Sequence, residues 1–291
     1  MNPYIQSLRL RTLPLSMSGI ILGSGLAYTH LSIPCPLPRF WWVFGLAILT
    51  TLSLQILSNL CNELGDALKG TDTDQQGREA YGLQAGTLTF AQIKKMIWLF
   101  VALSIVFGTV LVLTAFHFQL SDGRIYVFLG LGLLAIIGAA TYTLGKHSYG
   151  YMGLGDLGVF LFFGLLSTLG AYYLQTHTMN MKVVWCGMAI GLPCVGVLNL
   201  NNIRDMTNDR VHGKRTVAAA LGVTGAKCYH TGLLTVSLIL FGIYGHWWGG
   251  VVTPVWIWHL WFIWTHEGHS LDAQMPVLML STGLLACLGW L

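Results

Sequence analysis

Charged residues are scarce in this chain of 291 residues, and their scarcity excludes several classes of protein. Asp, Glu, Lys and Arg make up 9% of the chain, whereas a soluble domain carries about 25%. The formal net charge of +4 is too small and too scattered to indicate nucleic-acid binding. The six cysteines form no Cys-x-x-Cys pair and mostly fall in or beside apolar runs, so we interpret them as small packing residues.

Long apolar runs are abundant instead, and hydrophobic residues make up 54% of the chain. Runs of about 20 residues, the length that crosses a bilayer, recur from one end to the other. They predict nine transmembrane helices, at residues 12–30, 40–61, 91–118, 124–143, 155–175, 181–201, 225–246, 250–265 and 273–291. The eighth is short and rich in tryptophan, which is typical of a membrane interface. We therefore predict an all-α membrane protein, with about nine helices in one bundle and a single domain over residues 1–291.

Lys and Arg are unevenly divided between the two sides of this predicted bundle. With a cytoplasmic N-terminus, twelve of the 15 lie on the cytoplasmic side, and only Arg39, Arg124 and Lys182 lie on the other. The positive-inside rule therefore predicts a multi-pass protein whose N-terminus is cytoplasmic. Ten of the eleven acidic residues share the cytoplasmic side. Since acids contribute little to topology, we attribute their position to function.

Six of the eleven acids lie in two clusters, at 58–74 and 199–216, that each begin inside an apolar run and continue past its cytoplasmic end. Aligning Asn62 with Asn201 places Asp66 on Asp205, so both clusters contain Asn-x-x-x-Asp, a weak hint of an internal repeat. Residues four apart share one face of a helix. Each asparagine should therefore point the same way as its aspartate.

Two further aspartates are expected to join these faces. Asp209 lies four residues beyond Asp205, on the same predicted helical face. Asp72 lies six residues beyond Asp66, so we expect the chain to turn at Gly70 and bring it back. Facing carboxylates repel one another unless a cation joins them. Mg²⁺ suits such oxygen ligands and is usually bound through a few carboxylates plus substrate phosphates. Nearby cations that could hold the remaining phosphate oxygens are Lys69, Arg78, Arg204, Lys214 and Arg215.

Five segments carry more specific motifs, and they occur in a fixed order. They are Arg-Thr-Leu-Pro-Leu-Ser (11–16), Asn-Glu-Leu-Gly-Asp-Ala-Leu-Lys-Gly-Thr-Asp (62–72), Tyr-Thr-Leu-Gly (142–145), Gly-Tyr-Met-Gly-Leu-Gly-Asp-Leu-Gly-Val-Phe-Leu-Phe-Phe-Gly (150–164) and Asn-Asn-Ile-Arg-Asp-Met-Thr-Asn-Asp through Gly-Lys-Arg-Thr (201–216). Over nearly its full length the chain thus resembles the UbiA superfamily of intramembrane prenyltransferases, which has about nine helices and two Asp-rich cytoplasmic motifs. Glu63 and Asp156 depart from the common pattern, but each keeps a carboxylate.

The resemblance implies that a polyprenyl group moves from polyprenyl diphosphate to an aromatic acceptor in an Mg²⁺-dependent reaction. The menaquinone branch is the most similar, which implies 1,4-dihydroxy-2-naphthoate as acceptor and demethylmenaquinone, CO₂ and diphosphate as products. The alternatives are 4-hydroxybenzoate and homogentisate. We expect a bacterial inner membrane, a cytoplasmic mouth to the active site, and no protein partner.

The same resemblance assigns roles to residues. The implied Mg²⁺ ligands are Asp66, Asp72, Asp205 and Asp209. The implied donor-binding residues are Asn62, Asn201, Lys69, Arg78, Lys214 and Arg215. On the acceptor side, Arg11 is the candidate for the carboxylate and Asp156 for a ring hydroxyl, while Tyr142 and Lys146 could contact either substrate. Arg11 could instead be a topological anchor, and Asp156 an acid that complements a helix dipole.

Two other classes of function are weaker. A transporter should carry charges near the midplane of several spans, whereas these acids lie at helix ends. A non-catalytic scaffold would give two matched acidic clusters no role.

Overall fold

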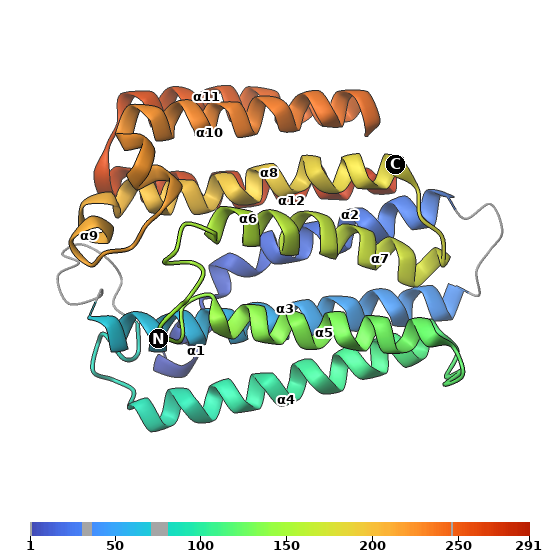
Figure 1. Cartoon of the computed structure of the whole chain (residues 1–291). Coiled ribbons are helices and arrows are strands. Elements are labelled where there is room, and N and C mark those ends of the chain that lie inside the picture. Colours follow the sequence, from blue (N-terminus) through green and yellow to red (C-terminus); the bar gives the residue numbers. More distant parts are fainter. Residues whose placement is uncertain (1, 31–36, 71–80, 246) are drawn as a thin grey trace.

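The structure is a computed structural model that describes residues 2–30, 37–70, 81–245 and 247–291, and over these residues its regular elements are all helical. Long helices run side by side in one bundle, and the two termini lie at opposite ends of it (Figure 1). The principal helices are α2 (Leu13–His30), α3 (Leu37–Lys69), α4 (Phe90–Ala115), α5 (Gly123–Thr141), α8 (Met181–Arg204), α10 (Val217–Tyr244), α11 (Thr253–Thr265) and α12 (Gln274–Cys287). One further rod joins α6 (Gly155–Val159), a π-helical segment (Phe160–Leu166) and α7 (Ser167–Thr176).

Seven helical segments of the described chain are long and apolar enough to cross a membrane. They are Pro38–Lys69, Phe90–Ala115, Gly123–Thr141, Gly155–Thr176, Met181–Arg204, Val217–Tyr244 and Gly268–Trp290. The other two predicted spans coincide with α2 and α11. With 13 residues, α11 is shorter than the roughly 20 that cross a bilayer. The all-α membrane fold is confirmed, and the count of nine spans stays a prediction.

Two helix boundaries differ by eight residues from those predicted, more than any other, because an apolar run and a hydrogen-bonded helix end for different reasons. Helix α3 continues to Lys69, eight residues past its predicted end at 61, and stops where Gly70 adopts a φ of 71°. Helix α10 begins at Val217 instead of 225, because the Thr216 hydroxyl accepts a hydrogen bond from the Ala219 amide at 3.0 Å. Gly222 then interrupts the helix with a φ of 72°.

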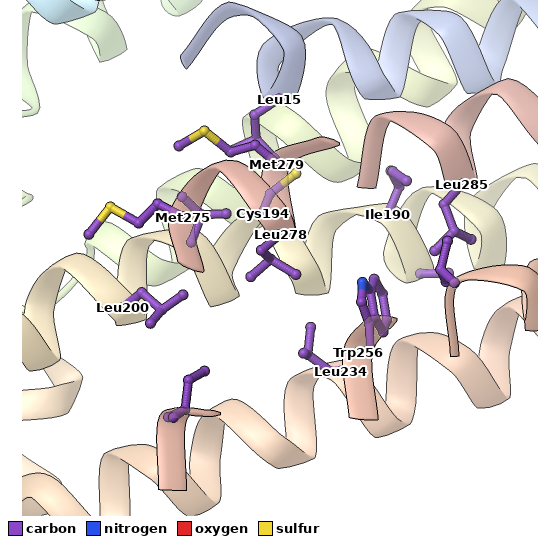
Figure 2. Packing of buried hydrophobic residues seen from close by; sticks show 14 of the residues in the cluster. Leu15, Ile190, Cys194, Leu200, Leu234, Trp256, Met275, Leu278, Met279 and Leu285 are labelled. Carbon is purple, nitrogen blue, oxygen red and sulfur yellow. The ribbon is translucent and has the colours of Figure 1, made fainter. Parts of the chain in front are cut away.

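The main hydrophobic core lies where α2, α8, α10, α11 and α12 meet, and its packing is shown in Figure 2. Ile190, Leu234 and Leu278 are fully buried there, and the Trp256 indole donates a hydrogen bond to the Ser281 hydroxyl at 2.8 Å. A second core joins α3, α4 and α5. Two packed cores give the helix ends a rigid frame on which to hold polar side chains.

The π-helical segment packs unusually close to α8. A Cβ placed on Gly164 would lie 2.7 Å from the Cα of Gly191, so only glycine permits this approach. The turn is wider than an α-helical one, and such segments are often found at functional sites. Here it directs Phe162, Phe163 and Leu166 toward an internal chamber.

Candidate active site

Both aspartate clusters lie at one end of the bundle, around a polar cavity of about 410 Å³. The ends of α3 and α8 meet there with the short helix α9 (Met206–Val211), at the left in Figure 1. The cavity wall includes nine of the residues assigned from sequence: Asn62, Asp66, Asn201, Asp205, Asp209, Arg11, Tyr142, Arg204 and Lys214. Helical spacing aligns the residues within each cluster, and the packing of the bundle brings the two clusters to one place.

Asn62 and Asp66 lie one turn apart near the end of α3, and both face the cavity as predicted. The Thr143 hydroxyl donates a hydrogen bond to the Asn62 side-chain oxygen. The Tyr151 hydroxyl donates one to Asp66 Oδ1 at 2.7 Å. The loop after α5 thus orients both polar side chains of the first cluster.

The second cluster spans a break between helices. Helix α8 ends at Arg204, and the Asp205 amide still donates to the Asn201 carbonyl at 2.9 Å. The buried Arg204 side chain lies 2.5 Å from Asp205 Oδ2 and also pairs with Asp272. Arg204 was a candidate phosphate ligand, but its guanidinium is paired with two carboxylates. Its evident role is to hold Asp205 against the wall.

Asp209 is the most buried of the cavity carboxylates, with 3% of its surface exposed. Burial raises the pKa of Asp209, the Lys214 ammonium opposes that rise, and the Asp205 and Asp66 carboxylates add to it. Lys214 Nζ lies 3.3 Å from Asp209 Oδ1. Oδ2 is buried and has no hydrogen-bond partner within the described part of the chain. A cation would satisfy this oxygen and favour the ionised carboxylate.

Sequence reasoning missed Tyr151, which contacts the groups around it through both its hydroxyl and its ring. Lys69 Nζ lies 3.6 Å from the centre of the ring, and Lys214 Nζ lies 5.7 Å from it. Lys69 also donates to the Thr143 carbonyl at 2.7 Å, and its side chain is not in the cavity wall. Tyr151 belongs to the glycine-rich motif at 150–164, which was the available signal.

Besides Lys69, five other assigned residues are absent from the described cavity wall. Lys146 and Arg215 are exposed to solvent and line neither large cavity. Asp156 lines a small separate void, which it shares with Tyr142 and Asn202. Asp72 and Arg78 fall outside the described residues. Their proposed roles stay predictions.

An apolar chamber of about 320 Å³ adjoins the polar cavity. Seven residues line both spaces: Arg9, Thr12, Asn62, Tyr142, Leu198, Asn201 and Met279. Burial raises the pKa of the Tyr142 phenol, so its hydroxyl stays protonated where the two spaces meet. A molecule with an anionic head and an apolar tail can place each part in a matching environment.

The cavity carboxylates fit a metal that also binds its substrate. Among the described residues, no three His, Cys, Asp or Glu side chains form a group that could hold a metal ion. Mg²⁺ does not need such a cage, because it is commonly held by one or two carboxylates plus phosphate oxygens. The unpartnered Asp209 Oδ2 and the carboxylates of Asp66 and Asp205 supply ligands of that kind.

Several known proteins are similar to this chain in sequence or in fold. The 1,4-dihydroxy-2-naphthoate octaprenyltransferase of Escherichia coli (strain K12) is 41% identical over 83% of this chain and 75% of its own. The enzyme of that name from Haemophilus influenzae is 40% identical over 81% of this chain and 74% of its own. A UbiA homolog from Archaeoglobus fulgidus, solved bound to GPP and Mg²⁺, has the same fold, with a TM-score of 0.67 and 14% identity over 99% of this chain and 98% of that one. The model of the UbiA prenyltransferase family matches residues 16–280, and the chain belongs to that family.

Proposed function

We propose that this protein transfers a polyprenyl group from polyprenyl diphosphate to 1,4-dihydroxy-2-naphthoate, giving demethylmenaquinone, CO₂ and diphosphate. The observation that carries the reaction class is a carboxylate-lined cavity that shares seven wall residues with an apolar chamber. The acceptor follows from the relatives of 41% and 40% identity, which are named for it.

The polar cavity would hold the diphosphate of the donor. Asp66, Asp205 and Asp209 would be the Mg²⁺ ligands, with Asp72 as the fourth. Bound Mg²⁺ would supply positive charge against the diphosphate. The amides of Asn62 and Asn201 can hydrogen-bond to phosphate or orient the carboxylates. The basic residues assigned to departing diphosphate are Lys214, Lys69, Arg78 and Arg215.

The apolar chamber would protect the reaction from water. When the carbon–oxygen bond of the donor breaks, its electron pair leaves with diphosphate and an allylic cation remains. Phe162, Phe163 and Leu166 line the chamber and keep water from that cation. The electron-rich ring attacks through the carbon that bears the carboxylate. Loss of CO₂ returns the bonding pair to the ring and restores its aromaticity.

We also propose the orientation indicated by the sequence. The chain would form one domain of nine spans, with its N-terminus and the polar cavity on the cytoplasmic side. In a bacterium this is the side of the inner membrane that water-soluble acceptors and diphosphates reach. Asp156 keeps its proposed role toward a ring hydroxyl of the acceptor, and Tyr142 and Lys146 keep theirs toward either substrate.

An assay of the purified protein tests the function. In lipid nanodiscs with Mg²⁺ and a polyprenyl diphosphate, dihydroxynaphthoate should yield prenylated product and an equal amount of CO₂. EDTA should stop turnover, and excess Mg²⁺ should restore it. Product from 4-hydroxybenzoate or homogentisate, but not from the naphthoate, would replace the acceptor and keep the reaction class. No product from any of the three would contradict the proposal.

A further inference from the structure

Arg9 occupies a position that the proposed mechanism does not yet use. It is one of the seven residues that line both the polar cavity and the apolar chamber. Its Nε is buried and has no hydrogen-bond partner among the described residues. Arg11, two residues on, lines only the polar cavity and is exposed. Arg9 is therefore the arginine at the junction of the two spaces.

The backbone at Arg9 is held in an unfavourable conformation. Its φ of 50° and ψ of 55° are left-handed, which side chains with a Cβ rarely adopt. The Thr12 hydroxyl donates to the Arg9 carbonyl at 3.0 Å, and the Asn59 amide donates to the Leu8 carbonyl at 2.9 Å. Such local strain persists only where surrounding contacts enforce it, and it is commonest at functional sites.

The buried Glu63 carboxylate of α3 holds the two chain segments that contain Arg9 and Tyr81. Glu63 Oε1 accepts hydrogen bonds from the Ser7 hydroxyl at 3.3 Å and from the Leu83 amide at 2.8 Å. Ser7 lies two residues before Arg9, and Leu83 lies two residues after Tyr81. The guanidinium carbon of Arg9 lies 4.2 Å from the centre of the Tyr81 ring. Contact with the ring and the strained turn together preorganise the guanidinium.

We propose that Arg9 binds the carboxylate of the aromatic acceptor and so holds the acceptor ring at the junction of cavity and chamber. This inference rests on the proposed function. There, the ring carbon that bears the carboxylate must meet the donor carbon between diphosphate and tail. The carboxylate therefore lies where the two spaces join, which is where Arg9 lies. A planar guanidinium can bind a carboxylate through two parallel hydrogen bonds, one of them from Nε.

Release of product follows from the same contact. The carboxylate that Arg9 binds leaves as CO₂, which carries no charge. The prenylated ring therefore has no carboxylate left for the guanidinium to bind, and affinity for the product falls as the reaction completes. Arg9 would thus determine specificity for acceptors that carry a carboxylate.

Steady-state kinetics of Arg9→Gln and Arg9→Lys test the assignment. Loss of the two parallel hydrogen bonds should raise KM for the naphthoate about tenfold or more in both variants. The donor KM should stay within about threefold, a change of less than 1 kcal/mol. Lys94 is an exposed cation near the start of α4, so Lys94→Gln is the matched control and should behave as wild type. Since Arg9→Lys keeps the charge, it decides the matter if Arg9→Gln does not fold.

An acceptor analogue without the carboxylate separates binding of that group from general damage to the site. The inhibition constant of 1,4-dihydroxynaphthalene should be the same for wild type and both Arg9 variants. An equal loss of affinity for the naphthoate and this analogue would overturn the assignment, as would an equal rise in both substrates' KM values. Unchanged naphthoate KM in an active variant would refute the Arg9 role alone. No naphthoate turnover by wild type would refute the proposed function and this inference with it.

Discussion

Individual carboxylates in the polar cavity have different neighbours, and their replacement should have different consequences. Asp66 accepts a hydrogen bond from Tyr151, which an asparagine in its place can also accept. Asp205 is one of two carboxylates that pair with the buried Arg204, and an amide in its place would leave that charge to Asp272 alone. Replacement of Asp66 should therefore mainly affect turnover, whereas replacement of Asp205 should affect both turnover and stability.

Asp66→Asn should lower turnover at least about 100-fold and lower the melting temperature less than Asp205→Asn does, because it removes a metal-binding charge while an amide oxygen can keep the hydrogen bond from Tyr151. Asp205→Asn should lower turnover as far and also destabilise the fold by about 2 kcal/mol. Turnover and thermal unfolding in detergent measure both effects. Asp122→Asn, at the other end of the bundle, should retain wild-type turnover. Wild-type turnover in Asp66→Asn or Asp205→Asn would remove the metal role.

Substitution of Tyr151 tests whether Asp66 needs the hydrogen bond that orients it. Tyr151→Phe loses the hydrogen bond to Asp66 but keeps the ring beneath Lys69. One hydrogen bond to a charged group corresponds to roughly a tenfold loss of kcat. Tyr151→Leu, which loses the ring as well, should lose more. Equal activity of wild type and Tyr151→Phe would show that Asp66 does not need this contact.

His177 predicts a pH dependence of stability at the opposite end of the bundle. Burial lowers the pKa of His177, the Arg39 and Arg124 charges add to this, and its Nε2 lies 3.0 Å from Arg39 Nη2. A lowered folded-state pKa means that the folded protein binds fewer protons than the unfolded chain. The stabilisation is therefore complete above the unfolded pKa of about 6.5 and is lost as pH falls through the folded pKa.

The melting temperature should consequently fall between about pH 7 and pH 5. His177→Asn should flatten this dependence, because asparagine does not titrate and tolerates the left-handed conformation at φ 54°. A variant with the same pH profile as wild type would assign the dependence to another group.

The close contact between the π-helical segment and α8 should contribute to stability. The π-helical segment and α8 touch through Gly164 and Gly191, and this contact supports the phenylalanines that line the chamber. Gly164→Ala places a methyl group against backbone, which should destabilise the protein by about 1–3 kcal/mol. Gly170→Ala, where a Cβ meets nothing within 4 Å, is the matched control. The melting temperatures of the two variants should differ by several degrees. Equal values would show that the helices move apart to accept the added methyl group at no cost in stability.

The position of the two termini indicates whether the whole chain crosses the membrane an odd or an even number of times. They lie at opposite ends of the bundle, as an odd number of crossings requires (Figure 1). Reporters fused to the N- and C-termini should therefore report opposite sides of the membrane, with the N-terminus cytoplasmic. Both reporters on one side would exclude nine spans, and an external N-terminus would reverse the proposed orientation.

Local sequence patterns predict much of this architecture. Apolar runs predicted the position of every principal helix, because a helix in a membrane must satisfy its backbone hydrogen bonds within its own segment. Spacing by four placed Asn62 with Asp66, since neighbours on one helical face are three or four residues apart. The glycine at position 70 indicated where α3 ends. These properties depend only on neighbouring residues, so a pattern along the chain is enough to predict them.

Tertiary structure alone decided which faces of these helices meet. Tyr151 reaches Asp66 across 85 residues of sequence, and Arg204 reaches Asp272 across 68. Sequence favoured Arg11 for the acceptor, whereas packing of Ser7 and Leu83 on Glu63 brings Arg9 to the junction. No helical period relates residues so far apart. Their contacts are set by the packing of the whole bundle, because a helix determines its own face but not the partner that covers it.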